Sequence, residues 1–283
     1  MPVKVDESGR RYVQSEVEVP GTPDEVWQAI ATGPGLSSWF VPAEFETGPD
    51  GVPERVTLHF GPGASMDSRS VVTAWDPPHR FAAESRDDLG PDDPTVATEW
   101  VVEARAGGTC VVRVVHSWFA DSDAWDEQWA GTEQGWRAFF RILRLYLTHF
   151  RGLGSSVFQL MGVAPDGASA PWDTLTGSLG LTGAVEGRRV ATAAGAPSFS
   201  GVVERVGPEE HPELLIRLDE PAPGLAHLFA LPMGGELYVP IRVFLYGERA
   251  AATAARAEPA WSAWLAGVFG PAEPGGGGPD PAR

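Results

Sequence analysis

A long run of apolar residues at helical spacing occupies residues 129–151. Successive apolar positions lie three or four residues apart, so they share one face of a helix, while four arginines line the other face. Gly152 follows the run and is expected to end it. Because aromatic rings dominate the apolar face, this predicted helix needs a broad apolar surface to cover it. That face comprises Trp129, Trp136, Phe139, Phe140, Leu143, Tyr146, Leu147 and Phe150.

The residues before this helix alternate between apolar and polar side chains, which is typical of strands that are buried on one face. The first such segment, residues 12–19, carries valines on one side and glutamates on the other. Six more segments follow later in the chain with no helices between them, and Gly-rich and Pro-rich turns separate them. This regular order predicts an antiparallel meander. The six strands are expected at residues 40–47, 54–60, 68–76, 79–85, 95–105 and 109–119.

Two short helices are expected between the first strand and the meander. Thr22 is a suitable N-cap and Pro23 a suitable first helical residue, so a helix is predicted to begin there. The Gly-Pro-Gly segment 33–35 is expected to break this helix, and residues 36–40 to form a second short helix or turn. The first part of the chain is therefore predicted to be an α+β domain in which a long helix lies across a curved antiparallel sheet.

Residues 153–270 follow the same order in a weaker form. A strand, a short helix, further strands and a final amphipathic segment succeed one another as they do in the first part of the chain. The final segment, residues 259–269, corresponds to the long helix but is expected to be short, at roughly half its length. We interpret this part as a degenerate second copy of the fold, and the alternative is an unrelated β-rich appendage. The other corresponding segments are residues 156–163, 172–175, 200–206 and 235–246.

Composition limits the classes of function. The formal net charge of −17 argues against a surface for nucleic acid or anionic lipid, because both need dense positive charge. No segment approaches the roughly 20 apolar residues of a membrane span, and residues 1–10 lack the apolar core of a signal peptide. We therefore expect a cytoplasmic protein with no nucleic-acid and no membrane partner. Residues 271–283 are rich in Gly and Pro and are expected to be disordered.

The order of strand, two short helices, meander and long helix resembles the SRPBCC, or START-like, helix-grip superfamily. In particular, it is similar to the branch related to the C-terminal domain of the Hsp90 ATPase activator. The resemblance covers about residues 1–150 and implies a curved antiparallel sheet wrapped around a long C-terminal helix. We expect one helix-grip domain at 1–152 and a degenerate second one at 153–270. The residues that carry the resemblance are Val17-x-Val19, Thr22-Pro23-x-x-Val26-Trp27-x-Ala29-Ile30, Gly33-x-x-x-Leu36-x-x-Trp39-Phe40, Trp75-Asp76-Pro77-Pro78 and Gly135-Trp136.

The resemblance implies an apolar small-molecule pocket between sheet and long helix, of some hundreds of Å³ on the scale typical of ligand sites. Its wall would come from the aromatic face of the helix, and its mouth from Trp39 and Phe40. The alternative is that these aromatic side chains simply fill the core. The expected wall residues are Trp129, Trp136, Phe139, Phe140 and Leu143.

Few polar residues could point into such a pocket. His116 alternates with valines along its predicted strand, so it shares a face with apolar side chains. It is therefore either a core histidine with satisfied hydrogen bonds or a ligand-facing one. His59 and Arg69 are further candidates, and His59 could lie on either face. Arg113 is expected on the outer face near an acidic partner.

The motifs of common catalytic sites are missing from the sequence. There is no G-x-S-x-G elbow, no H-E-x-x-H segment and no G-x-G-x-x-G turn. Cys110 is the one cysteine, and no histidine is placed by sequence to activate it. The carboxylates of Asp121, Asp123, Asp126 and Glu127 do not match the spacing of a calcium loop. We therefore expect no catalytic residues, no metal and no cofactor.

Three functions remain as hypotheses. The first is binding of an apolar small molecule without catalysis, because it requires only what the sequence visibly has. The second is an enzyme resembling the polyketide cyclases and aromatases of the superfamily, which would need His116, His59 or Arg69 deep in the pocket. The third is a protein-interaction module by analogy with the Hsp90 activator, with a protein as partner. The ligand and the oligomeric state are left open.

Overall fold

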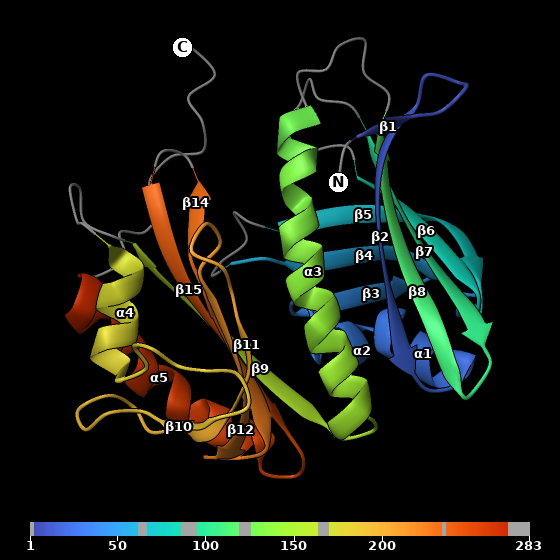
Figure 1. Cartoon of the computed structure of the whole chain (residues 1–283). Coiled ribbons are helices and arrows are strands. Elements are labelled where there is room, and N and C mark those ends of the chain that lie inside the picture. The colour runs from blue at the N-terminus through green and yellow to red at the C-terminus, as the bar shows by residue number, and fades with distance from the viewer. Residues whose placement is uncertain are drawn as a thin grey trace. The chain divides into compact units, whose positions relative to one another are not determined.

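A computed structural model describes residues 3–61, 67–85, 95–118, 126–163, 170–233 and 236–270, without the side chains of 126–134, 233 and 236. The chain divides into two compact units, Met1–Gly152 and Leu153–Arg283 (Figure 1), which are called unit 1 and unit 2 below. The tail 271–283, for which we expect disorder, lies outside the described residues.

Unit 1 contains an eight-stranded antiparallel sheet, one long helix and two short helices. The first long strand, β2, pairs with the last, β8, and the other strands of the meander follow outward in the order β8-β7-β6-β5-β4-β3. This confirms the predicted meander, with strand ends that differ by a few residues. The strands are β1 Lys4–Val5, β2 Arg11–Pro20, β3 Ala43–Thr47, β4 Pro53–His59, β5 Asp67–Asp76, β6 Arg80–Ser85, β7 Val96–Arg105 and β8 Thr109–Trp118.

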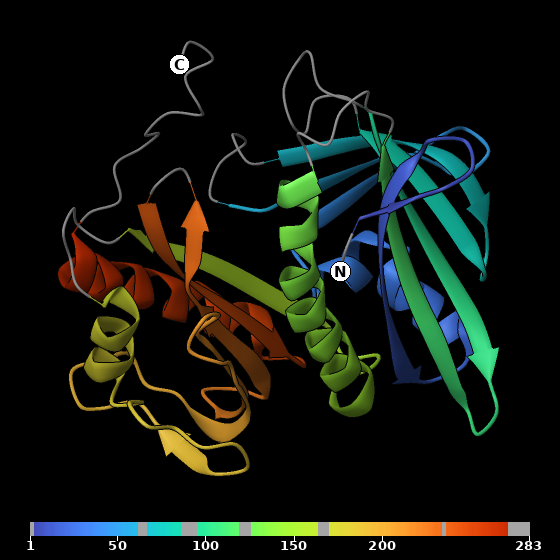
Figure 2. The ribbon, with the colours of Figure 1, turned by 45° about the horizontal axis from the view of Figure 1, so that its top comes forward.

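The long helix α3, Asp126–His149, runs across the curved sheet of unit 1 (Figures 1 and 2). It begins three residues before the predicted start and turns at Gly152, which has a positive φ of 78°. Its described apolar face is buried, with Ile142 and Leu143 fully inaccessible, and Arg144 on the opposite face is exposed. The predicted amphipathic helix is therefore confirmed where its side chains are described.

The two short helices are α1, Pro23–Ile30, and α2, Gly33–Ser37. Thr22 caps α1 as predicted, and Glu25 completes the capping box. The break between the helices lies at residues 31–32, however, and the Gly-Pro-Gly segment belongs to α2. The prediction that this segment ends a helix is wrong because proline at the second helical position needs no N–H donor there. The Thr32 side chain caps α2 by accepting from Gly35 N.

Unit 2 repeats this connectivity with fewer strands. Its first strand, β9, pairs with its last, β15, as β2 pairs with β8, and the remaining strands follow in the order β15-β13-β12-β11-β10. The short β14 also pairs with β15, at the end opposite to the β13 contact. Unit 2 is thus a degenerate second copy of the helix-grip topology. Its strands are β9 Ser155–Val163, β10 Arg189–Ala191, β11 Ser200–Val206, β12 Glu213–Glu220, β13 Gly224–Phe229, β14 Leu231–Met233 and β15 Glu236–Tyr246.

The helices of unit 2 are α4, Pro171–Leu179, and α5, Ala250–Phe269. The predicted short C-terminal helix is wrong, because α5 has 20 residues against 24 in α3. Pro259 lies inside α5, whereas a proline usually marks a helix start or an interruption. The alanine-rich turns before it have high helical propensity, and buried Ala250 and Ala254 anchor them to the core.

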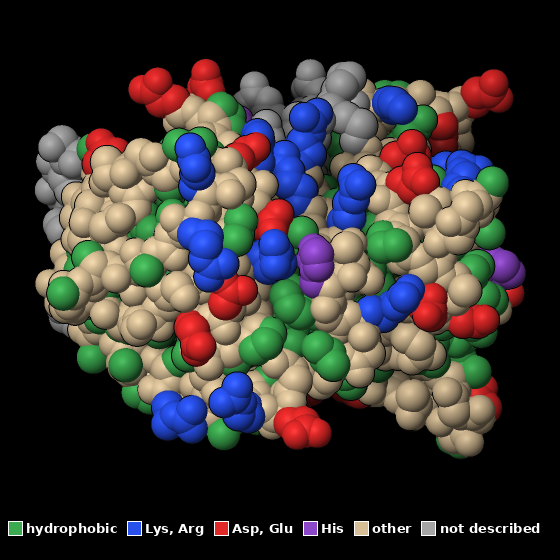
Figure 3. Space-filling model, turned by 60° about the horizontal axis from the view of Figure 1, so that its bottom comes forward, with side chains coloured by type: hydrophobic (Ala, Val, Ile, Leu, Met, Phe, Trp, Pro, Cys, Tyr) green, Lys and Arg blue, Asp and Glu red, His purple; other side chains and the backbone are tan. Residues whose placement is uncertain are grey.

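Charged side chains of both signs lie interspersed on the face shown in Figure 3. On the outer face of the unit 1 sheet, the Arg113 guanidinium lies 3.3 Å from Glu16 and 3.2 Å from Glu103. This confirms its expected acidic surroundings. Within the described residues, no helix is both long and apolar enough to cross a membrane.

Two glycines in helices give opposite predictions for stability. A Cβ at Gly35 would lie 1.9 Å from the carbonyl oxygen of Gln28, whereas a Cβ at Gly135 in α3 would meet nothing within 4 Å. We expect Gly35→Ala to destabilise unit 1 by about 2 kcal/mol, because α2 must move away from α1. Gly135→Ala, the matched control, should stabilise it by about 0.5–1 kcal/mol. Thermal unfolding followed by tryptophan fluorescence measures both changes, and equal shifts would contradict the close approach of the two short helices.

Candidate functional site

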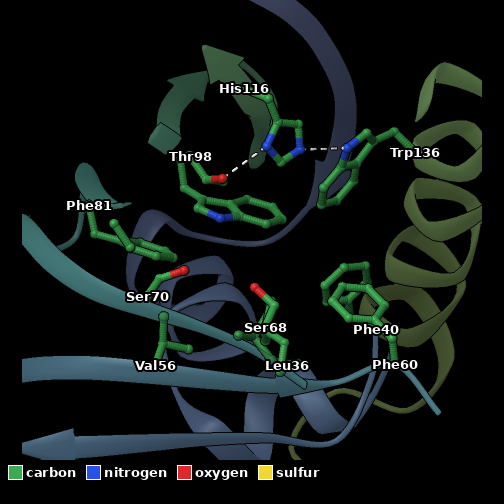
Figure 4. A pocket seen from close by; sticks show the side chains of 13 residues that line it. Leu36, Phe40, Val56, Phe60, Ser68, Ser70, Phe81, Thr98, His116 and Trp136 are labelled. Carbon is green, nitrogen blue, oxygen red and sulfur yellow. Dashed lines mark hydrogen bonds between the residues drawn. The ribbon is translucent and has the colours of Figure 1, made fainter. Parts of the chain in front are cut away.

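A cavity of about 100 Å³ lies inside unit 1, lined by α2, the sheet, the segments that follow α2 and β4, and Trp136 of α3 (Figure 4). It is smaller than the several hundred Å³ expected from the resemblance. Aromatic rings occupy the remaining space: the Trp136 ring stacks on Phe40 with 5.2 Å between centroids and meets Trp100 edge-to-face at 5.2 Å. The lining residues are Leu36, Phe40, Val56, Leu58, Phe60, Ser68, Ser70, Phe81, Ala83, Thr98, Trp100, His116 and Trp136.

The pairing of β4 with β5 decides which side chains reach the cavity. Val56 lies opposite Ser70, and Leu58 lies opposite Ser68. Side chains alternate between the two faces of a strand, so these four residues share the cavity face. Their sequence neighbours therefore point to the other face.

His59 and Arg69 are such neighbours, and the expectation that they line the cavity is wrong. His59 Nδ1 lies 2.7 Å from Oδ1 of Asp67, and Arg69 Nη2 lies 3.4 Å from Oδ2 of the same carboxylate. The Arg69 side chain is 69% exposed. Both residues thus belong to a polar cluster on the outer face, one position away from the cavity-facing register.

His116 joins the sheet to the long helix at the cavity. It lies directly opposite Thr98 in the pairing of β7 with β8, and its Nδ1 is 2.9 Å from Thr98 Oγ1. Its Nε2 accepts a hydrogen bond of 2.8 Å from Nε1 of Trp136 (Figure 4). His116 is therefore both a core histidine with satisfied ring nitrogens and a residue that lines the cavity.

The partners of His116 fix its protonation state. An indole N–H can only donate, so the Nε2 that accepts from Trp136 carries no hydrogen. The hydrogen of the neutral ring must then sit on Nδ1, which donates to Thr98 Oγ1. Burial lowers the pKa of His116 from its ordinary value of 6.5 to about 4. The imidazole is consequently neutral at pH 7, in the Nδ1–H form.

The other predicted site residues divide into three groups. Phe40 and Trp136 line the cavity together with His116. Trp39, Phe140 and Leu143 are buried core, at most 3% exposed, and the Trp39 indole donates to the carbonyl of Ala29. The predictions that Phe140 and Leu143 form the cavity wall and that Trp39 lies at its mouth are therefore wrong. The remaining two are Phe139, which packs edge-to-face on Phe40 without lining the cavity, and Trp129, whose side chain lies outside the described residues.

The hydroxyls of the cavity, which belong to Ser68, Ser70 and Thr98, were not predicted from the sequence. Their signal is present in the alternation, since Ser70 follows Ser68 at a spacing of two in a strand whose other face carries charge. The strand register that brings Thr98 beside His116 could not be read from one sequence. It depends on which residues pair across β7 and β8.

The described residues contain no group of three His, Cys, Asp or Glu side chains that could hold a metal ion. Asp121 and Asp123 lie outside the description, and the side chains of Asp126 and Glu127 are not described. Cys110 is fully buried and its Sγ lies 3.3 Å from the carbonyl oxygen of Gly21. Burial raises its thiol pKa, which disfavours the reactive thiolate.

The neutral state of His116 predicts a specific loss of stability in acid. Between pH 6.5 and about 4 the unfolded chain protonates this histidine while the folded chain does not, so the free energy of unfolding falls as the pH falls. The loss should reach at most about 3 kcal/mol, since one pKa unit corresponds to about 1.4 kcal/mol. Denaturant unfolding of wild type and His116→Gln at pH 7 and pH 4.5 measures it.

His116→Gln should abolish the fall in the free energy of unfolding that protonation of this histidine causes. The matched control is His79→Gln, at an exposed position in the turn between β5 and β6. A wild-type pH dependence that persists unchanged in His116→Gln would contradict the burial of a neutral ring.

Residues 20–148 match the family model described as activator of Hsp90 ATPase homolog 1-like protein. No curated protein matches the chain. Among solved structures, a protein from Mesorhizobium loti is 19% identical, covers 49% of this chain and 97% of its own, and has a TM-score of 0.40. The Aha1 dimer from Colwellia psychrerythraea is 19% identical, with coverages of 48% and 95% and a TM-score of 0.37.

The di-domain ARO/CYC BexL from the BE-7585A biosynthetic pathway is 14% identical and covers 92% of this chain and 98% of its own, with a TM-score of 0.43. All three TM-scores lie below 0.5. The family match lies within unit 1 and spans its meander and long helix. Unit 1 therefore has the helix-grip fold, and its residues 20–148 are similar to the activator of Hsp90 ATPase homolog 1-like family.

Proposed function

We propose that unit 1 binds a small, uncharged and largely apolar molecule in its cavity. The observation that carries this proposal is the lining itself, in which nine apolar side chains enclose a space near three hydroxyls and one imidazole. An apolar cavity with a few convergent polar groups is the usual composition of a small-molecule site. Its described lining contains no Asp, Glu, Lys or Arg, which supports an uncharged occupant.

The size of the cavity sets the scale of the occupant. An engineered apolar cavity of about 150 Å³ holds benzene, and the space in unit 1 is about 100 Å³. A molecule with one ring thus requires a modest displacement of the wall. The Phe40 ring forms part of this wall, and it is a side chain that can yield without a change in the sheet.

The geometry of His116 supports binding over acid–base catalysis. A general base needs a lone pair that can reach the substrate proton. The Nε2 lone pair of His116 accepts from Trp136, and its Nδ1 donates to Thr98. With His59 and Arg69 on the other face of the sheet, the enzyme hypothesis has no described ionisable group placed for proton transfer.

Filling the cavity should abolish binding. Ser70 lines the cavity, whereas Val71, the next residue of the same strand, is 53% exposed on the other face. We expect wild type and Val71→Phe to bind toluene with equal affinity, and Ser70→Phe to bind it at least about tenfold more weakly because the added ring occupies the space. Isothermal titration calorimetry measures the affinities, and native mass spectrometry of the same three proteins reports any co-purified molecule.

Circular dichroism of Ser70→Phe shows whether the variant retains the fold. Equal toluene binding by all three folded proteins would place the bound molecule elsewhere. Absence of binding to wild type, with no co-purified molecule, would reject the cavity as a ligand site.

A further inference from the structure

The hydroxyl of Thr98 has a hydrogen that the sheet leaves unused. Its Oγ1 accepts from Nδ1–H of His116, because the Trp136 indole fixes that tautomer. Among the described residues, His116 is the one side-chain or backbone group that bonds to this hydroxyl. A hydroxyl that accepts one hydrogen bond still has its own hydrogen to donate, and Thr98 lines the cavity.

The hydrogen bonds at this point run in one direction. Trp136 donates to His116, and His116 donates to Thr98, so each group in turn is polarised to donate more strongly (Figure 4). This series of hydrogen bonds begins at Trp136 on α3, passes through His116 on β8 and ends at Thr98 on β7, at the cavity. The direction of these hydrogen bonds cannot be reversed, because an indole nitrogen does not accept a hydrogen bond.

The other side chains that line the cavity determine which ligand group can bind to the Thr98 hydroxyl. The Ser68 and Ser70 hydroxyls point toward the same space in Figure 4, and the other walls near it are the apolar rings and aliphatic groups of the lining. No carboxylate among the described lining residues could hold a cation, and no Lys or Arg could hold an anion. A neutral acceptor oxygen is therefore the group that best matches the site.

We propose that Thr98 is the specificity-determining residue of unit 1, and that its hydroxyl donates to a carbonyl oxygen of a small, uncharged, one-ring ligand. This inference rests on the proposed binding function and adds to it the class of molecule. His116 and Trp136 act as positioning residues, since they orient the Thr98 hydroxyl without touching the ligand oxygen. Flat aromatic walls from Phe40 and Trp100 suit a planar carbonyl compound.

The test compares two probes of nearly equal shape. Acetophenone carries a carbonyl oxygen where isopropenylbenzene carries a methylene group, so only acetophenone can accept from Thr98. We expect Thr98→Val to weaken acetophenone binding about tenfold and to change isopropenylbenzene binding less than twofold, as one hydrogen bond predicts. Thr98→Ser, which keeps a hydroxyl, should restore most of the acetophenone affinity. Isothermal titration calorimetry on the full chain measures all six affinities.

The outcomes separate this inference from the proposed function. Equal effects of Thr98→Val on both probes would overturn the role of the hydroxyl while leaving an apolar binding site in place. Binding of neither probe to wild type would count against the binding function itself, and with it against the ligand class.

A second measurement does not depend on a variant that folds. Nitrogen NMR of the wild-type histidine side chains at pH 7 should show His116 with its hydrogen on Nδ1 and none on Nε2. A hydrogen on Nε2 would overturn the direction of the hydrogen bonds from Trp136 to Thr98, and with it the assignment of the Thr98 hydroxyl as a donor to the ligand.

Discussion

The hydrogen bond from Trp136 to His116 fixes the long helix of unit 1 to its sheet within an aromatic interface. Around it, Trp136 stacks on Phe40 and meets Trp100 edge-to-face, so the indole position is set by packing on both sides. Apolar packing alone does not distinguish one helix register from another nearby. A single donor that must meet a single acceptor does distinguish them, because loss of the bond leaves two buried polar groups without partners.

The same constraint connects stability with the chemistry of the cavity. Because Trp136 can only donate, the imidazole must remain neutral for the helix to stay in place. A protonated ring would direct an N–H toward the indole N–H, and burial disfavours that charge independently. Both ring nitrogens of His116 are thereby engaged in structural hydrogen bonds, so His116 does not act as a base in the cavity. It affects a ligand by orienting the Thr98 hydroxyl.

Much of this architecture follows from the sequence, because it depends on periodicity. The alternation of unit 1 predicts its strands, and the helical spacing after residue 129 predicts the face of α3 that is buried. The errors arise where a second element decides the outcome. His59 is one position out of the cavity face, which only the pairing of β4 with β5 reveals. Pro259 suggests a helix start, yet the alanines before it pack into the core and extend α5 to Ala250.

The resemblance predicted a cavity, but its size and lining could not be predicted from the residues, because they result from a mismatch in size between two surfaces. The helix side presents large rings, and the sheet side presents Ser68, Ser70 and Ala83, which are too small to fill the space between them. Small residues in a core usually leave a void only at a cost in stability. Here the void also borders the Thr98 hydroxyl, whose hydrogen has no acceptor among the described residues, and this adds the cost of a hydrogen bond left unmade. An occupant with one acceptor atom would remove both costs at once, so the features that weaken unit 1 as a folded domain are those that favour a bound ligand.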